Sequence, residues 1–178
     1  MIWLLPLSFL QVHRAEQDRE IYYQLLEPET HQFRISHDFN VAKVGQKSVQ
    51  SLIRKGSTAW NPRFFNLDTG EDLKAYPVEG AVQADLARPV GEGESVRIRV
   101  QETYTDPVGC KMEGEQLVWD RTLGRPRNQV TLPAGWMLTE STVPAIITLD
   151  AEGRVVCKFN NPRNDELHVI LKAKKRPK

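Results

Sequence analysis

The sequence has few cysteines, no excess of either charge, and no hydrophobic run long enough to span a membrane. Its 24 basic and 23 acidic residues nearly cancel, so no global field attracts nucleic acid, and no nucleic-acid partner is expected. The apolar stretch of residues 2–12 is shorter than the roughly 20 residues that a membrane-spanning helix needs. Ordinary apolar and aromatic fractions, 40% and 8%, exclude a disordered or fibrous chain.

Motifs for catalysis and metal binding are missing as well. The four histidines form no His-x-His or His-Glu-x-x-His pair, and the two cysteines form no Cys-x-x-Cys, so no metal is expected. There is no Gly-x-Ser-x-Gly turn, and Gly91-Glu92-Gly93-Glu94 lacks the lysine of a phosphate loop. The sequence therefore predicts a protein that is not an enzyme and carries no cofactor.

An enzyme of unrecognised type remains an alternative, with three residues worth testing. Cys110 follows Pro107-Val108-Gly109 in an expected loop, which makes it the most exposed nucleophile candidate. Glu102 falls on the apolar side of an expected strand, where it marks either the emergence of the strand into solvent or a buried acid paired with arginine. His168 lies on the polar face of the last expected strand. Nothing in the sequence places these three residues together.

Residues 1–15 are predicted to be a signal peptide or short hydrophobic leader. Ile2 to Val12 are almost all apolar, as in a secretory signal, and Ala15 is a candidate for the residue before the cut. A retained anchor and a piece of the fold are the alternatives, because no basic residue precedes the run and His13 stands where a small residue is expected. We expect export, to the periplasm or the extracellular space.

Cys110 and Cys157 are a candidate disulfide pair in an exported protein. Closing that loop would constrain the unfolded chain by about 4 kcal/mol in the chain-entropy model. Cys157 is expected in the core in either case, because it alternates with Val155 and Phe159 on one face of a strand. Two plain thiols are the alternative, and the sequence leaves that choice open.

The dominant hydrophobic period is two, which is typical of β-strands with one buried face. Residues 31–41 show it best, since alternate positions from His31 to Val41 are aromatic, aliphatic or histidine and the intervening positions are polar. Residues 96–104 and 167–171 repeat the pattern. Turn residues separate these runs at short intervals, and no segment favours a helix.

These patterns predict an all-β protein, a β-sandwich of about ten to twelve mainly antiparallel strands with little or no helix. A barrel is the alternative architecture. Residues 16–173 are expected to form a single domain, with a weak subdivision near residues 105–107. Residues 174–178 form a basic C-terminal tail, which is expected to be solvated, with a weak contact to an anionic membrane surface as its alternative role.

Tryptophans near expected turns give the most specific hint of a ligand. Trp60 and Trp119 each precede turn residues, and Trp136 follows Pro133-Ala134-Gly135. An aromatic ring beside a loop can stack on a sugar ring, although tryptophan in a β-sandwich is more often part of the core. Trp60, Trp119 and Trp136 are therefore the candidate residues of a carbohydrate-binding module.

Several segments resemble β-domains of exported bacterial proteins. They are Arg88–Val96, Leu132–Trp136, Val143–Ala145, Gly153–Val156 and Asn161-Pro162. Similar sequences occur in the N-terminal β-domains of gluzincin-type zinc aminopeptidases and in β-domains that precede transglutaminase-like modules. The resemblance covers about residues 80–175 and lacks the zinc motif. It implies an accessory β-module without a catalytic domain.

The sequence as a whole predicts a non-catalytic exported module that binds another protein or a component of the cell envelope. The exposed edge strands of a β-sandwich offer surfaces for such contacts. A glycan, bound through the three candidate tryptophans, is the alternative partner. An enzyme of unrecognised type is the third interpretation.

Overall fold

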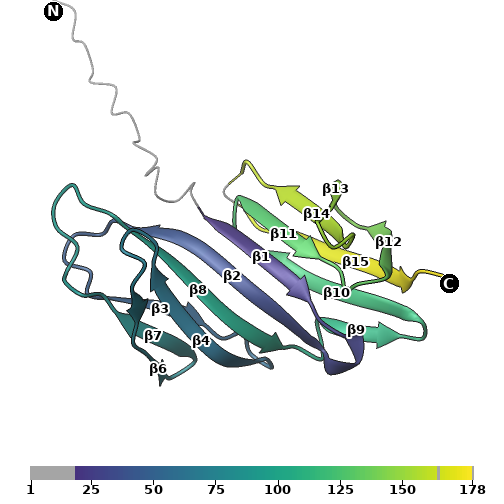
Figure 1. The fold of residues 1–178 in the computed structure, drawn as a ribbon, viewed down its shortest axis with the longest axis horizontal. Helices are drawn as coiled ribbons and strands as arrows, with labels where there is room; N and C mark the ends of the chain where they lie inside the picture. Colours follow the sequence, from purple (N-terminus) through teal and green to yellow (C-terminus); the bar gives the residue numbers. More distant parts are fainter. Residues whose placement is uncertain (1–18, 164, 178) are drawn as a thin grey trace, which may run out of the picture.

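The protein is described by a computed structural model that covers residues 19–163 and 165–177 (Figure 1). The regular secondary structure of the described residues is all strand, apart from a single 3-10 turn, η1 (Pro28–Thr30), and these residues contain no α-helix. The predicted all-β class is confirmed. The described residues form fifteen strands, more than the ten to twelve expected, because several are only two to five residues long.

The strands follow one another along the chain with short connections. Their bounds are β1 (Glu20–Leu25), β2 (Gln32–Val41), β3 (Ser48–Leu52), β4 (Thr58–Asn66), β5 (Asp72–Leu73), β6 (Ala75–Val78), β7 (Ala81–Asp85), β8 (Val96–Thr105), β9 (Cys110–Glu113), β10 (Gln116–Leu123), β11 (Arg127–Thr131), β12 (Trp136–Ser141), β13 (Ile146–Leu149), β14 (Val155–Asn160) and β15 (Leu167–Lys175).

One large sheet and two small sheets make up the described fold (Figure 1). The large sheet has eight strands in the order β13-β14-β11-β1-β2-β8-β4-β5. The small sheets have the orders β12-β15-β10-β9 and β3-β7-β6. Neighbouring strands run antiparallel, apart from β1 and β11, which are parallel. The mainly antiparallel arrangement agrees with the short connections expected from the turn residues.

Both small sheets cover the same face of the large sheet. Phe33 and Ile35 of β2 pack in a core against the four-stranded sheet, and Val41 of the same strand packs in a second core against the three-stranded sheet. All three residues share one parity along β2, so they point to one side of the large sheet. Within residues 19–163 and 165–177 the large sheet is therefore covered on one face only, which explains the alternation of apolar and polar residues along its strands.

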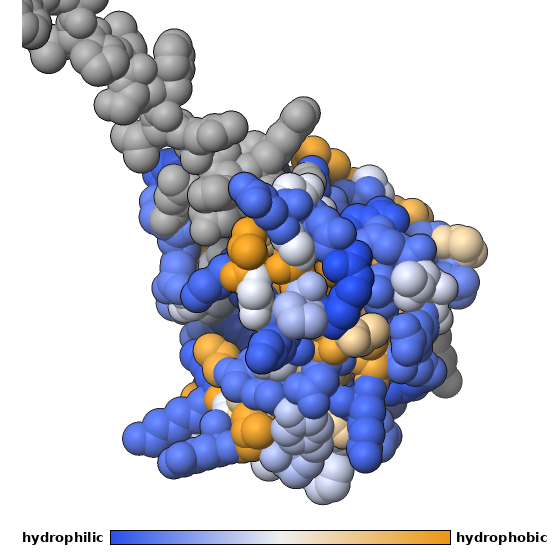
Figure 2. Space-filling model, turned by 90° about the vertical axis from the view of Figure 1, so that its left-hand side faces the viewer, coloured by the Kyte–Doolittle hydropathy of each residue, from blue (hydrophilic) through white to orange (hydrophobic). Residues whose placement is uncertain are grey.

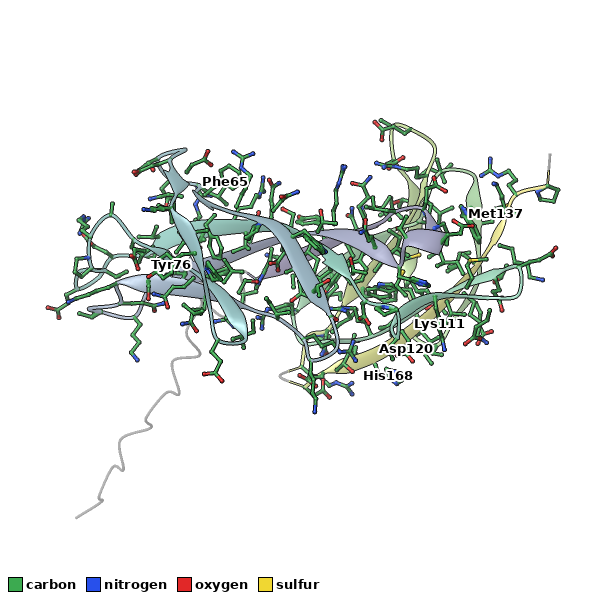
Figure 3. All side chains as sticks on the ribbon, turned by 90° about the horizontal axis from the view of Figure 1, so that it is seen from below. Phe65, Tyr76, Lys111, Asp120, Met137 and His168 are labelled. Atoms are coloured by element: carbon green, nitrogen blue, oxygen red, sulfur yellow. The ribbon has the colours of Figure 1, made fainter. Side chains whose placement is uncertain are left out.

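The opposite side of the large sheet is named here the open face. It carries the side chains at the alternate, mostly polar positions of the same strands, which point away from the two small sheets. Figure 3 shows Phe65 on the side of the open face, with Asp120 and His168 at the other side, on the outer surface of the four-stranded sheet. The end of the molecule that carries β3, β6 and β7 is mostly hydrophilic, and its hydrophobic side chains stand in small separate groups (Figure 2).

A buried ion pair lies within the core under the four-stranded sheet. Arg121 of β10 points inward and is 8% exposed, and its Nη1 donates to Oδ2 of Asp106 at 2.7 Å. The guanidinium also lies over three rings, at 4.8 Å from the centroid of Phe33, 5.4 Å from Tyr104 and 5.8 Å from Tyr23. Aromatic faces and a carboxylate together compensate the desolvated cation.

The segment after β8 is shaped by the same carboxylate. Asp106 is 3% exposed, and its Oδ1 accepts the backbone N–H of Gly109 at 2.9 Å. A Cβ at Gly109 would lie 2.7 Å from both Asp106 Oδ2 and the backbone oxygen of Asp120, so this position has no room for a side chain. The subdivision considered near residues 105–107 falls here, and the core under the four-stranded sheet takes residues from both sides of it.

The predicted leader and the predicted basic tail lie at the two ends of the given sequence. The expected leader, residues 1–15, lies outside the described residues. At the other end β15 continues to Lys175, so Lys174 and Lys175, assigned to the basic tail by sequence, belong to the last strand. Among the described residues we find no helix with the length and hydrophobicity needed to cross a membrane.

Candidate functional site

The open face presents rows of side chains that cross the large sheet from strand to strand. The strand registers fix two adjacent rows. The first contains Ile146, Lys158, Gln129, Tyr22, Ser36, Gln101 and Arg63. The second contains Thr148, Val156, Thr131, Gln24, Arg34, Thr103 and Trp60.

A groove of about 510 Å³ follows these rows over β1, β2, β8 and β11. Its hydrogen-bonding lining is dominated by neutral side chains, amides and hydroxyls. They include Gln24, Ser36, Asn61, Gln101, Thr103 and Gln129. A concave surface with several converging neutral donors and acceptors can bind a polar ligand through side-chain hydrogen bonds.

Three charged residues line the groove: Arg34, Arg154 and Glu102, and the carboxyl group of Glu102 is buried and accepts a hydrogen bond from Ser51. Arg154 is already bound, with its Nε 2.7 Å from Oδ2 of Asp150 and its Nη2 3.3 Å from Oε2 of Glu152. Arg34 is exposed, and within residues 19–163 and 165–177 its side chain has no hydrogen bond or ion pair. Arg34 is therefore available to an anionic group of a ligand.

Trp60 stands at the end of the second row, opposite Thr103. The register between β4 and β8 shifts between Trp60 and Arg63, and Asn61 within this bulge has φ 49°. Because Ala59 packs against the core, the alternation turns Trp60 toward the open face, where its side chain is 56% exposed. Trp60 is therefore an exposed tryptophan beside the polar groove.

The other two candidate tryptophans lie in the core. Trp119 is 0% exposed and makes edge contacts with the rings of Tyr23, at 5.1 Å, and Phe33, at 6.4 Å. Trp136 is 6% exposed in the same core. Both rings face inward because their strands present them to the large sheet, so Trp60 alone of the three is accessible to a ligand.

The two cysteines are buried free thiols. Cys110 lies in β9 opposite Trp119, and Cys157 lies in β14 opposite Val130, so the two residues belong to different sheets. Burial raises the pKa of Cys110 to about 12 and that of Cys157 to about 11. Thiols held protonated in this way are poor nucleophiles.

The expectation of Cys110 as an exposed loop residue was wrong. The residue is 1% exposed because β9 forms a hairpin with β10, which turns Cys110 and Met112 toward the core. The signal was present in the sequence, since Gly114 follows an alternating run and lies at φ 61° in the turn.

Glu102 is a buried acid. It is 6% exposed, its Oε1 accepts the hydroxyl hydrogen of Ser51 at 2.8 Å, and its Oε2 has no partner among the described residues. Burial raises the pKa of this carboxyl, while the Ser51 hydrogen bond and the charge of Arg121 act in the opposite direction. Of the two alternatives given for Glu102, burial is observed, with a serine as the direct partner.

The three residues considered for an unrecognised enzyme do not converge. Glu102 lies on β8 of the large sheet, and Cys110 lies in the core on β9. His168 lies on the outer surface of the four-stranded sheet, where its Nε2 is 2.7 Å from Oδ1 of Asp120 (Figure 3). In the described part of the chain, no three His, Cys, Asp or Glu residues are arranged to hold a metal ion.

A second surface lies at the β13 edge of the large sheet. Strand β13 has four residues, and three of them are aliphatic and strongly exposed: Ile146 at 67%, Ile147 at 47% and Leu149 at 63%. Ile146 lies on the open face opposite Lys158, whereas Ile147 and Leu149 point to the core side, opposite Cys157 and Val155. This group of three residues is named here the β13 edge.

Comparison with known proteins gives a fold but no family. No protein-family model and no curated protein matches the chain. Among solved structures, the M1 zinc metallopeptidase from Deinococcus radiodurans, as a mutant bound to a Tyr-Ser-Ala substrate, matches with a TM-score of 0.57 at 14% identity. A further structure of this metallopeptidase matches with a TM-score of 0.56 at 13% identity.

The match extends over most of this chain and less than half of the metallopeptidase. It covers 88% of this chain and 41% of that chain, so this chain spans about two fifths of the length of its structural neighbours. The matching region is the N-terminal domain, which confirms the resemblance to gluzincin aminopeptidase β-domains at the level of the fold. At this identity the likeness shows the fold alone.

Proposed function

We propose that the protein is a non-catalytic, exported β-sandwich module that binds another protein by adding an extended strand of that partner to the β13 edge. The observation that carries the proposal is the exposure of Ile147 and Leu149, at 47% and 63%, on the core side of the large sheet. Aliphatic side chains on the face of a sheet are normally covered by another layer.

The large sheet extends beyond the sheet that covers it. Cys157 and Val155 of β14 are 0% and 7% exposed, yet Ile147 and Leu149, their neighbours on β13, are largely exposed. The covering layer therefore ends at β14, and β13 overhangs it. A partner chain placed beside β13 would continue the sheet and bury the overhanging side chains.

The backbone of β13 supports the same proposal. β13 is the last strand of the sheet, so one row of its N–H and C=O groups faces away from β14. Natural edge strands are commonly protected by lysine, proline or inward charges, and Ile146–Leu149 contains none of these. An added strand would pair these groups and contact Ile146 on one face and Ile147 and Leu149 on the other.

The non-catalytic and exported parts of the proposal rest on other observations. The catalytic candidates lie apart, and the fold matches 41% of the metallopeptidase chain, a likeness compatible with a non-catalytic N-terminal domain. Export rests on the apolar residues 2–12 of the sequence. Cell fractionation with intact-mass measurement tests export, and an uncut product in the cytosol would contradict it.

Photo-crosslinking tests the β13 edge. A photoreactive amino acid in place of Ile146 should give one defined adduct in the native cell. The matched control is the same amino acid in place of Leu52, which is 75% exposed on β3, at a distance from the edge in sequence and in sheet order. The adduct at position 146 should identify a partner that the control does not trap.

Binding of the purified partner then decides the proposal. Ile147→Lys places a charge on the overhang and should abolish binding, whereas Leu52→Lys should leave it unchanged. Both substitutions are at exposed positions and should change the unfolding free energy by less than about 1 kcal/mol. Unchanged binding of Ile147→Lys, an adduct common to both positions, or an adduct with a second copy of this chain would overturn the proposal.

A further inference from the structure

We propose that the open-face groove binds an acidic oligosaccharide, a glycan with carboxylate-bearing sugars, with Arg34 as the partner of a carboxylate and Trp60 as the platform on which a sugar ring stacks. This site is separate from the β13 edge, and its evidence is independent of the function proposed above.

The position of the groove in the sheet determines how it can bind. It lies over β1, β2, β8 and β11, which are interior strands with neighbours on both sides. Their backbone groups are engaged in the sheet, so a ligand there cannot be bound by strand addition. It must be recognised by side chains that project from the open face.

Those side chains match the hydroxyl groups of sugars. Gln24, Gln101 and Gln129 each offer a carbonyl oxygen and an amino group, and Ser36 and Thr103 offer hydroxyls that donate and accept. A sugar hydroxyl also donates and accepts, so it can be satisfied by neighbouring amides in several orientations. A peptide would instead bring apolar side chains, for which this lining has little complement.

The charge of the groove favours a ligand with carboxylates. Asp38 and Arg99, beside the groove, neutralise one another through two hydrogen bonds of 2.6 and 2.7 Å. Arg154 is neutralised by Asp150 at 2.7 Å. Arg34 is left as an exposed cation without a partner in the described residues, and its planar guanidinium suits a carboxylate bidentately. Lys158, an exposed cation next to Gln129 in the first row, lies outside the lining and three strands from Arg34. Cations spaced in this way fit isolated carboxylates better than a highly charged polyanion.

Arg34 and Trp60 are placed at a spacing that one short glycan can bridge. Both belong to the second row, with Thr103 between them, so their backbones lie about 10 Å apart, two strand spacings. The flat face of an exposed indole packs against the C–H face of a pyranose. One sugar can stack on Trp60 while the carboxylate of a neighbouring sugar reaches Arg34.

Calorimetry and tryptophan fluorescence on the full chain test this assignment. The probes are oligogalacturonate, alginate and hyaluronan fragments, with cellohexaose as the neutral control and a glutamate oligopeptide as the acidic peptide. At least one acidic glycan should bind with an affinity about tenfold or more above that of cellohexaose. The accompanying fluorescence change should disappear in Trp60→Ala.

Variants locate the site. Arg34→Gln should remove the preference for the acidic glycan over the neutral one, and Trp60→Ala should lower the affinity for it by about tenfold or more. Arg88→Gln is the matched control, because Arg88 is an exposed arginine outside the groove, bound to Glu94 at 2.6 Å. Ile147→Lys should also leave glycan binding unchanged. Glycan binding by the groove can therefore be tested separately from partner binding by the β13 edge.

Four results would overturn the proposal. They are the absence of binding by every acidic glycan, equal binding of cellohexaose, equal binding of the glutamate peptide, and affinity that survives both Arg34→Gln and Trp60→Ala.

Discussion

Removing the cation from the buried pair of Arg121 and Asp106 should be among the most damaging single changes in the protein. Arg121→Met keeps much of the side-chain length and apolar stem but deletes the guanidinium that lies 2.7 Å from Asp106. The carboxylate, 3% exposed, would keep the N–H of Gly109 at 2.9 Å and the half-exposed Arg54 at 3.8 Å. Gly109 carries no charge, and Arg54 is half-exposed and too distant for a hydrogen bond, so it offsets the carboxylate only in part.

The expected loss follows from the asymmetry of buried ion pairs. Breaking such a pair by removing one partner costs about 3–5 kcal/mol, because an uncompensated charge stays in the interior. The loss of the guanidinium from above the rings of Phe33 and Tyr104 acts in the same direction. With a urea m-value of about 2 kcal/mol/M, the midpoint of unfolding should fall by roughly 1.5–2.5 M.

Equilibrium urea unfolding measures this change, with an exposed pair as control. Arg63 and Asp72 lie 3.0 Å apart but are 59% and 62% exposed, so Arg63→Met should cost less than about 1 kcal/mol. The double variant Arg121→Met with Asp106→Leu should recover much of the lost stability, since it removes both charges. A loss for Arg121→Met no larger than that for Arg63→Met would refute the reasoning.

Two further predictions concern buried titratable groups. Burial raises the pKa of Cys110 to about 12 and that of Cys157 to about 11, so neither thiol should react with Ellman's reagent at about pH 8 in the native protein. Both thiols should react in denaturant, and fast reaction of the native protein would contradict their burial. The pKa of Glu102 is raised above its ordinary value of 4.5, so the native state retains that proton longer than the unfolded state. The free energy of unfolding of the wild type, relative to that of Glu102→Gln, should therefore fall as the pH rises above 4.5, and urea unfolding at several pH values measures it. An increase over this range would show that the pKa of Glu102 is lowered in the native state.

The alternating strands were predictable from sequence, because each carries its own evidence of a buried face. Residues 31–41 became β2 and residues 96–104 became β8 with the expected parity. Trp60 was expected to precede a turn, because Asn61-Pro62 is typical of a strand end, but residues 58–62 form the first half of β4. In the structure Asn61-Pro62 lies in a bulge of β4. Proline is tolerated there because β5 pairs only with Phe64 and Phe65, so this part of β4 has no second neighbour among the described strands.

The candidate sites were predictable only in part. Trp60 was identified because a tryptophan beside turn residues is conspicuous by itself. Arg34 was not, because its place in the lining of the groove depends on the register of β1, β2, β8 and β11, and the parallel pairing of β1 with β11 cannot be read from the local sequence. The β13 edge was missed for a related reason, since exposure of Ile147 depends on where a different sheet ends.

The parallel contact between β1 and β11 also constrains the order in which the protein can be assembled. β1 lies in the middle of the large sheet, between β11 and β2, yet it is the first of the described strands along the chain. During synthesis it can pair with β2 at once, but its second neighbour emerges only after β3 to β10. The centre of the large sheet therefore closes late, through a contact distant in sequence, and folding should be slow for a domain of this size.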